Sequence, residues 1–522
     1  MSAARTELQQ VLCRYVTDTL IYIDTVRGFC EDVSKWGLHR ETELNMMIDI
    51  KERVDNHVSK SGSDAKLQEE LDAVLKDTLV GLAKLEYFLV AVEKLAVTSL
   101  HVFTENQALC LPKGITLGCV QVVITVARLI CPLLLEFKRD AQVFFLPRLQ
   151  NVEVLSYELD KYIRTTQKIC ETLGKSDFHS KMTTDTVVNL DVDLSEDDMR
   201  RMLDHINLLD EIRMDKHFRL VFLFQEESFC DFISDFSKRQ ERMLEFLNDL
   251  EEGAIQLDRM NKGAKISSVV GSSVGAAGGV LSIVGLALIP FTAGVSLALT
   301  MTGLGMGITS GVNSAVTTAT EIGVNATQRN KAREVFQKFM EDVQSIQECL
   351  NKVTNQVDTE KVESIIKVAL GVGKGLGKAF VIGRGIDALV DAAAAAKLLK
   401  NEDLIAGVAK APLGLAKSAR AGFIALNALF LGMDIFFIIK DSISLAKGNE
   451  TAFSQWIRAR ATLWSSEMDS WQGIHDSLCE GRETSEKKKA LLETPLYPEM
   501  DVEKRNEEEM AFFPDKVEEN MK

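Results

Sequence analysis

Residues 271–307 read GSSVGAAGGVLSIVGLALIPFTAGVSLALTMTGLGMG and lie inside a long uncharged run. No Asp, Glu, Lys or Arg occurs from Ile266 to Thr320, although 26% of the 522 residues are charged. Pro290 and Gly294 favour a turn, which divides the run into two arms. Each arm exceeds the roughly 20 residues that a helix needs to cross a bilayer core. We therefore predict a hydrophobic helical hairpin over residues 266–320.

Glycines recur at every fourth position over part of each arm, at mirror positions about Phe291, which follows Pro290 at the turn. If the chain folds back there, each glycine lies level with a glycine of the other arm, and the two helices can approach closely. Six glycines at about 1 kcal/mol each make a poor water-exposed helix, whereas lipid favours helix because the backbone must satisfy itself. We predict a hairpin that inserts conditionally; a buried hairpin inside a soluble bundle is the alternative. The glycines are Gly271, Gly275, Gly279, Gly303, Gly307 and Gly311.

The composition restricts the fold and the partners. A formal net charge of -16 argues against nucleic acid as the main partner, because phosphate backbones are bound through clustered Lys and Arg. Only eight prolines occur, and alternating strand patterns are scarce, so the chain is predicted to be all-α. The nine cysteines contain no CxxC pair, which is typical of buried thiols in a reducing compartment.

Helical patterns divide the chain into regions. An apolar stripe near the start, with three- and four-residue spacing, predicts an N-terminal helical bundle of unknown role over residues 1–174. Residues 175–194 are polar and β-branched without helical period, so we predict a linker. Ser195 and Asp198 form a capping-box pattern that predicts the start of a second helical region. The stripe consists of Leu8, Leu12, Tyr15, Val16, Leu20 and Ile23.

Two amphipathic helices are predicted to flank the uncharged run, one over residues 236–257 and one over residues 336–357. Their apolar stripes are consistent with an antiparallel coiled coil or with an ordinary helical core. Residues 481–522 are rich in charge, contain three prolines and lack a period, so we expect a disordered charged tail.

A second apolar segment, residues 421–439, is just long enough to span a bilayer and contains one charge, Asp434. A carboxylate in a membrane helix must be neutralised, paired or placed along a wet path, although Asp434 on a surface helix would face solvent. Upstream, Lys367, Lys374 and Lys378 lie close to one helical face. This pattern suits anionic lipid headgroups, and a solvated lysine face is the alternative.

The uncharged block, followed by an amphipathic helix, resembles the apolipoprotein L family. The resemblance resumes in ALFLGMDIFFIIKDSISLAKG, residues 428–448, and covers residues 195–480 as a region. It implies lipid binding, lipid transport and membrane permeability, with some members secreted onto lipoprotein particles and others intracellular. Residues 1–194 show no match to the family pattern.

We expect a lipid-binding protein that associates with membranes, inserts conditionally at low pH and alters ion permeability. A soluble, lipoprotein-associated lipid carrier and a helical scaffold are the alternatives. No catalytic, metal or cofactor constellation stands out, so we expect no enzyme and no cofactor. The expected partners are lipids and anionic membrane surfaces, with self-association or a helical protein partner as further options. MSAARTELQQVLCRY lacks the apolar core of a secretory signal, so we expect a cytoplasmic, intracellular membrane-associated protein, while the resemblance leaves secretion open.

Overall fold

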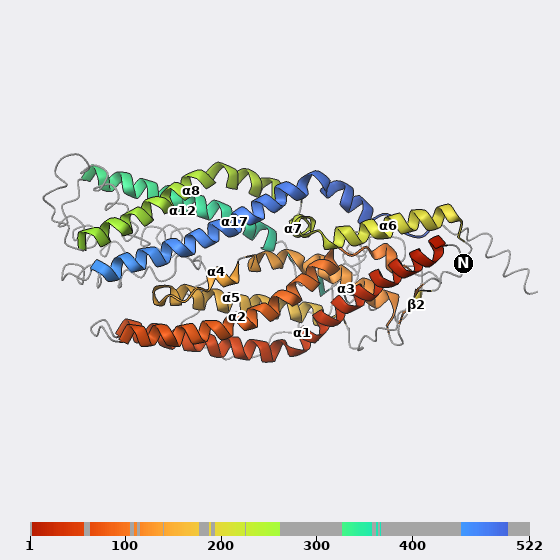
Figure 1. Ribbon diagram of the computed structural model, residues 1–522, viewed down its shortest axis with the longest axis horizontal. Coiled ribbons are helices and arrows are strands. Elements are labelled where there is room, and N and C mark those ends of the chain that lie inside the picture. Colours follow the sequence, from red (N-terminus) through yellow and green to blue (C-terminus); the bar gives the residue numbers. More distant parts are fainter. Residues whose placement is uncertain are drawn as a thin grey trace, which may run out of the picture.

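The computed structural model of this chain is an elongated assembly of long helices (Figure 1). Labels follow Figure 1, gaps in the numbering included. The structure describes residues 3–56, 63–104, 109–111, 115–138, 140–176, 187–188, 194–224, 226–261, 326–355, 357, 362–363, 366 and 450–498. The predicted all-α class is confirmed. In these residues the strands are β1 (Leu109–Cys110) and β2 (Val187–Val188), which pair antiparallel.

We refer to residues 3–174 as the N-terminal half of the molecule and to the later helices as its second half. The N-terminal half forms a bundle of four α-helices. The 3-10 helices η1, η2 and η3 and the one-turn helix α4 connect or precede them. The α-helices are α1 (Ala3–Asn56), α2 (Ser63–Ala96), α3 (Leu117–Ile130) and α5 (Val152–Gly174). The short elements are η1 (Leu100–Phe103), η2 (Cys131–Phe137), α4 (Ala141–Phe144) and η3 (Leu149–Asn151).

Helices α1 and α2 form an antiparallel pair along most of their length. The indole N–H of Trp36 donates to the carbonyl oxygen of Gly81 at 3.0 Å, and the rings of Phe29 and Phe88 stack at 4.4 Å. The predicted α1 stripe is buried, with every member at most 3% exposed. Burial of this stripe against the rest of the protein is what orders so long a helix, since isolated helices gain little from propensity alone.

The apolar segment around α3 lies in the core. In the part of the chain that the structure describes, Leu117–Phe144 is the one helical stretch long and apolar enough to cross a membrane, and 78% of its most apolar window is buried. Helix α3 ends at Ile130, and Pro132 is the second residue of η2. Proline cannot continue an α-helix from within, so it breaks the segment there.

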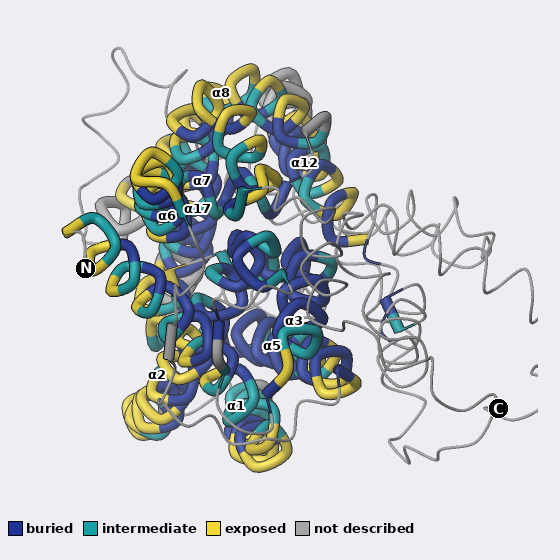
Figure 2. Tube along the Cα trace, turned by 90° about the vertical axis from the view of Figure 1, so that its right-hand side faces the viewer, coloured by how far each residue is buried: buried dark blue, intermediate teal, exposed yellow. Residues whose placement is uncertain are grey.

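The second half contains α6 (Glu196–Met214), α7 (Lys216–Leu223), α8 (Glu226–Asn261), α12 (Ala326–Asn355) and α17 (Glu450–Leu492). Figure 2 shows these helices as one group against α1, α2, α3 and α5, with buried residues on the facing sides. The predicted cap of α6 is confirmed, because the Ser195 hydroxyl accepts from the backbone N–H of Asp198 at 3.1 Å. The buried apolar side chains of both groups belong to one continuous core.

The predicted disordered tail is wrong for residues 481–498. Helix α17 continues to Leu492, and its buried positions in this part keep helical spacing. Gly481 lies so close to α7 that an added Cβ would stand 2.5 Å from the Val221 side chain. Because glycine, serine and lysine occupy several inward positions, the composition resembles a solvated segment although the helix is docked. Leu478, Gly481, Ser485, Leu492 and Leu496 are buried, and Lys488 on the same face is half-buried. Residues 499–522 lie outside the described residues.

Residues 175–194, the predicted linker, are described in part. Val187 and Val188 pair with β1, and Ser176 is buried at the end of α5. Every cysteine whose side chain the structure describes is a free thiol, but the predicted burial is wrong for Cys230 and Cys479, which are exposed.

Candidate functional site

Helices α8 and α12, which flank the uncharged run, pack against one another. The rings of Phe246 and Phe339 stack at 4.3 Å, and the Arg242 guanidinium donates to the Asp342 carboxylate at 2.6 and 2.8 Å. Because residue numbers rise along one helix as they fall along the other, the pair is antiparallel. The two flanking helices therefore run antiparallel, the direction that the coiled-coil option requires.

A third helix completes this core. Helix α17 contacts α8 through Ser237, whose hydroxyl lies 2.9 Å from Nε2 of His475, and through a hydrogen bond between Gln240 and Gln472. The ring of Trp464 meets Phe339 edge-on, with centroids 5.1 Å apart. The stripes thus belong to a three-helix core, a form of the ordinary helical core that was the alternative to a two-helix coiled coil.

Three helix ends meet at one end of the molecule, which we call the attachment end and define by Asn261, Ala326 and Glu450. Extending the antiparallel registers along α8 brings Asn261 level with the first turn of α12 and with the first turn of α17. Figure 1 shows these ends together at the left. The chain therefore leaves for residues 262–325, returns from them, and comes back from residues 367–449 at the same end.

The residues predicted to contact lipid lie outside the described residues. The structure brings together the helices that flank them and does not describe the residues themselves. They are Gly271, Gly275, Gly279, Pro290, Phe291, Gly303, Gly307, Gly311, Lys367, Lys374, Lys378 and Asp434.

A buried carboxylate joins α8 to α12 near the middle of α12. Asp342 is 4% exposed and faces Arg242 and Arg239, the second at 3.4 Å. The hydrogen bond with Asp342 raises the pKa of Arg242 above its ordinary value. Asp235 lies on α8, as Arg242 does. Desolvation acts to raise the pKa of Asp235, but hydrogen bonds from Arg239 and Ser345 bring it below its ordinary value. The two helices are held by charge as well as by apolar contact.

Asp342→Asn is expected to loosen this pairing. An amide keeps the shape but removes the charge that Arg242 and Arg239 share, which should lower the free energy of unfolding by about 1.5–3 kcal/mol. Thermal and urea unfolding followed by circular dichroism measure the change. Glu245→Gln, on an exposed position of α8, removes one negative charge as a control. Equal stability of the two variants would contradict the role assigned to Asp342.

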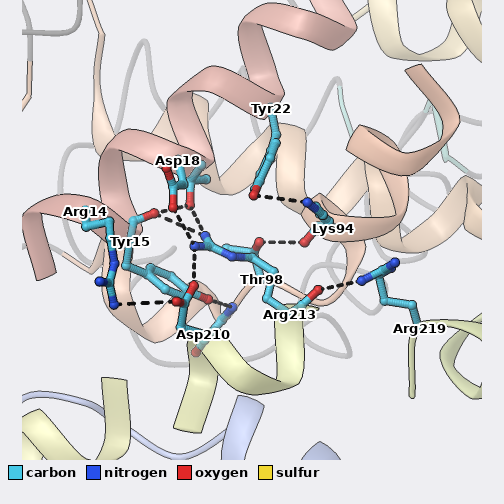
Figure 3. Close-up of polar contacts among 11 residues, drawn as sticks. Arg14, Tyr15, Asp18, Tyr22, Lys94, Thr98, Asp210, Arg213 and Arg219 are labelled. Carbon is cyan, nitrogen blue, oxygen red and sulfur yellow. Dashed lines mark hydrogen bonds and ion pairs between the residues drawn. The ribbon is translucent and has the colours of Figure 1, made fainter. Parts of the chain in front are cut away.

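A fully buried arginine joins the two halves of the molecule (Figure 3). The guanidinium of Arg213, on α6, donates to the backbone carbonyl of Tyr15 at 3.1 Å and to the Thr19 hydroxyl at 3.0 Å, both on α1. It also pairs with Asp210 at 2.7 Å and Asp18 at 3.5 Å. We call this cluster the Arg213 node.

Aromatic rings enclose the node. The Arg213 guanidinium carbon lies 3.8 Å from the ring centroid of Tyr15 and 5.4 Å from that of Tyr22. Burial raises the pKa of the Tyr15 phenol, with Arg213 acting against it. Figure 3 also shows Lys94 of α2 reaching the Tyr22 hydroxyl, and Arg219 reaching the backbone of Arg213. The node therefore ties α6 and α7 to both α1 and α2.

The apolipoprotein L family model matches residues 186–470, more than half of the chain. The chain belongs to the apolipoprotein L family. The match includes α6, α7, α8, α12 and the first half of α17, together with the attachment end. The N-terminal bundle and the second half of α17 lie outside it. The Arg213 node is thus a contact between a family helix and the N-terminal bundle.

Human relatives show the same relation at moderate identity. Apolipoprotein L3 of Homo sapiens is 27% identical over 250 residues, covering 45% of this chain and 59% of that protein. Apolipoprotein L5 is 34% identical over 142 residues, covering 24% and 33%. Apolipoprotein L6 is 26% identical over 256 residues, covering 47% and 73%. The matches therefore span 59% and 33% of the lengths of the first two relatives. No solved structure gives a significant match.

Sequence reasoning missed the Arg213 node. In MRRMLDHINLLDEIRM the arginine lies two residues after Glu211 near a helix end, where a cation is commonly solvent-exposed. The available signal was the helical spacing of Ile206, Leu209 and Arg213, which puts the arginine on the buried face. No group of three potential metal ligands occurs within the described ranges.

Proposed function

We propose that this apolipoprotein L-family chain is a non-enzymatic lipid-binding protein that associates with anionic membranes and inserts its uncharged hairpin conditionally. Family membership supports a lipid-associated or membrane-related role, and it fits membrane or intracellular association as well as secretion. The observation that carries the finer proposal is the attachment end, where both flanks of residues 262–325 meet the start of α17. An uncharged run of two membrane-length arms joined to one end of a helical body can enter a bilayer without dismantling that body.

A titratable trigger follows from the acidic composition. Carboxylates that protonate at low pH lose much of the desolvation cost of approaching lipid, so membrane association should increase on acidification. Asp434 is the acid inside the apolar segment of residues 421–439 and would have to be neutralised for that segment to enter a bilayer. Insertion of the paired glycine arms would alter permeability to ions.

Flotation of the full-length protein with phosphatidylserine-containing liposomes tests the proposal. Lys367, Lys374 and Lys378 changed together to Glu should weaken binding on the order of 100-fold, because each basic residue contributes about 1 kcal/mol near an anionic surface. High salt should reduce wild-type binding before insertion, since headgroup attraction is screened. Flotation should be greater at mildly acidic than at neutral pH.

A matched control makes the same charge change elsewhere. Lys66, Lys76 and Lys84 are exposed on α2, and changing them to Glu should alter flotation little. Equal losses in the two triple variants would mean that net charge, rather than the lysine-bearing segment, governs binding. A wild-type protein that never floats, and that carries co-purifying lipid, would favour the lipid-carrier alternative.

A further inference from the structure

The second half of α17 lies beyond the family match and touches the N-terminal bundle. We call residues 478–498 the C-terminal clasp. The Glu493 carboxylate pairs with Arg128 of α3 at 2.8 Å, and the Ser99 hydroxyl donates to the carbonyl oxygen of Leu492 at 2.7 Å. The Tyr497 hydroxyl donates to the carbonyl oxygen of Val102 in η1 at 3.1 Å. The clasp therefore binds the bundle through its last turn and the residues after it.

The same segment also contacts the family region. The Lys488 ammonium pairs with Asp215, the cap residue of α7, at 2.5 Å, and His205 of α6 donates from Nε2 to the carbonyl oxygen of Leu491 at 3.0 Å. Desolvation acts to raise the pKa of Asp215, but the hydrogen bond from Lys488 helps bring it below its ordinary value. The clasp thus lies over the junction between the two halves of the molecule.

The clasp is a weaker contact than the Arg213 node. The Glu493 side chain is 52% exposed, whereas Arg213 is fully buried. A half-exposed ion pair contributes little because solvent and salt screen it. The clasp has three buried apolar side chains, Leu478, Leu492 and Leu496, and the last two lie in the part that contacts the bundle. A short terminal segment held in this way can detach while the node keeps α6 on α1.

We propose that the C-terminal clasp is a releasable internal restraint on α17, which keeps the family region closed against the N-terminal bundle. Helix α17 begins at the attachment end, ten residues after the segment 421–439, and ends in the clasp. With the clasp docked, both ends of α17 are fixed to the body. Release frees α17 to move with the segment that precedes it. This inference rests on the proposed membrane association and adds the element that controls it.

His101 of η1 lies beside the clasp, 3.9 Å from Glu493. Burial lowers the pKa of His101; the Glu493 charge raises it, and Arg128 of α3 and His205 of α6 lower it further. Because the Glu493 charge favours the protonated imidazole, this pair does not release the clasp on acidification.

A charge reversal and a C-terminal truncation test the restraint. Glu493→Lys places a cation against Arg128 and His101, and Glu483→Lys makes the same charge change at an exposed position of α17. A chain ending at Ala490 removes the anchoring residues, and a chain ending at Pro498 keeps them. The probes are hydrogen–deuterium exchange of residues 478–490 and flotation with phosphatidylserine liposomes at neutral pH.

We expect Glu493→Lys and the chain ending at Ala490 to exchange faster in residues 478–490 than their controls. Their flotation at neutral pH should rise roughly fivefold, as loss of a contact of this class predicts. If both variants exchange faster yet float like their controls, the restraint is refuted while the proposed function stands. If Glu493→Lys leaves exchange unchanged, the chain ending at Ala490 is compared with the chain ending at Pro498. Faster exchange without greater flotation in that pair again refutes the restraint. If neither the wild type nor any variant floats at either pH, the proposed function fails and the restraint fails with it.

Discussion

Arg213→Met should destabilise the closed protein by about 3–5 kcal/mol, the loss typical of removing one partner from a buried ion pair. Methionine fills a similar volume but donates no hydrogen bond. Asp210 and Asp18 would then remain partly buried without the guanidinium that lies between them, and the carbonyl of Tyr15 would lose a donor. Thermal unfolding by circular dichroism and urea unfolding by tryptophan fluorescence should both shift to milder conditions.

The control for this prediction removes an arginine from the same cluster. Arg14 is 58% exposed and lies 3.7 Å from Asp210, so Arg14→Met should cost about 1 kcal/mol or less. Limited proteolysis should in addition cut the α6–α7 region faster in Arg213→Met than in Arg14→Met, because the node joins that region to α1. If the two variants have the same stability and cleavage rate, the node does not hold the two halves together.

Apolar periodicity predicted the helices because burial of a stripe determines where a long helix forms. The stripe from Leu8 to Ile23 is buried, and so are the described members of the α8 and α12 stripes except Leu350, which is half-buried. Ser195 caps α6 as its spacing predicts. Such patterns are local, since three- and four-residue spacing is visible within one segment. Partner choice is not local, which explains why α17 as the third helix of the core was not foreseen.

The errors share one physical cause, the replacement of apolar residues by polar residues at buried positions. Arg213 occupies a core position because Tyr15, Tyr22 and two carboxylates satisfy it, and none of these partners can be located from the sequence of α6 alone. In the clasp, Gly481 permits close approach to α7 where a larger residue would collide. Composition therefore indicated a solvated tail, although the tertiary contacts order it.

The candidate site has two parts: the flanking helices, which the structure describes, and the segments predicted to contact lipid, which lie outside the described residues. The flanking helices were predicted and are observed, and their register defines the attachment end. The glycine arms, the lysines at 367, 374 and 378, and Asp434 lie outside the described residues, so their roles stay predictions. The local pattern identifies these residues but not the lipid or protein surface that would surround them.

Replacing both Gly275 and Gly307 by leucine should abolish most dye release from phosphatidylserine liposomes while leaving flotation largely intact. The two positions are symmetric about Phe291, so in a folded-back hairpin the added side chains meet at one level and push the arms apart. Leucine is a better helix former and more lipophilic than glycine. A mechanism that depends on hydrophobicity alone therefore predicts equal or greater dye release, which is the opposite result.

Ser273→Leu with Thr309→Leu is the matched control, because these residues lie at nearly the same levels but on the opposite helix faces. The control adds the same two side chains away from the glycine contact and should retain dye release. Full release by Gly275→Leu with Gly307→Leu would exclude close glycine packing as the basis of permeability. If that variant instead loses stability in water, as measured by thermal unfolding without lipid, the hairpin is already packed in the closed protein. The buried-hairpin alternative would then replace the membrane-inserting one, because only a hairpin that contributes to the closed fold can destabilise it when its arms are separated.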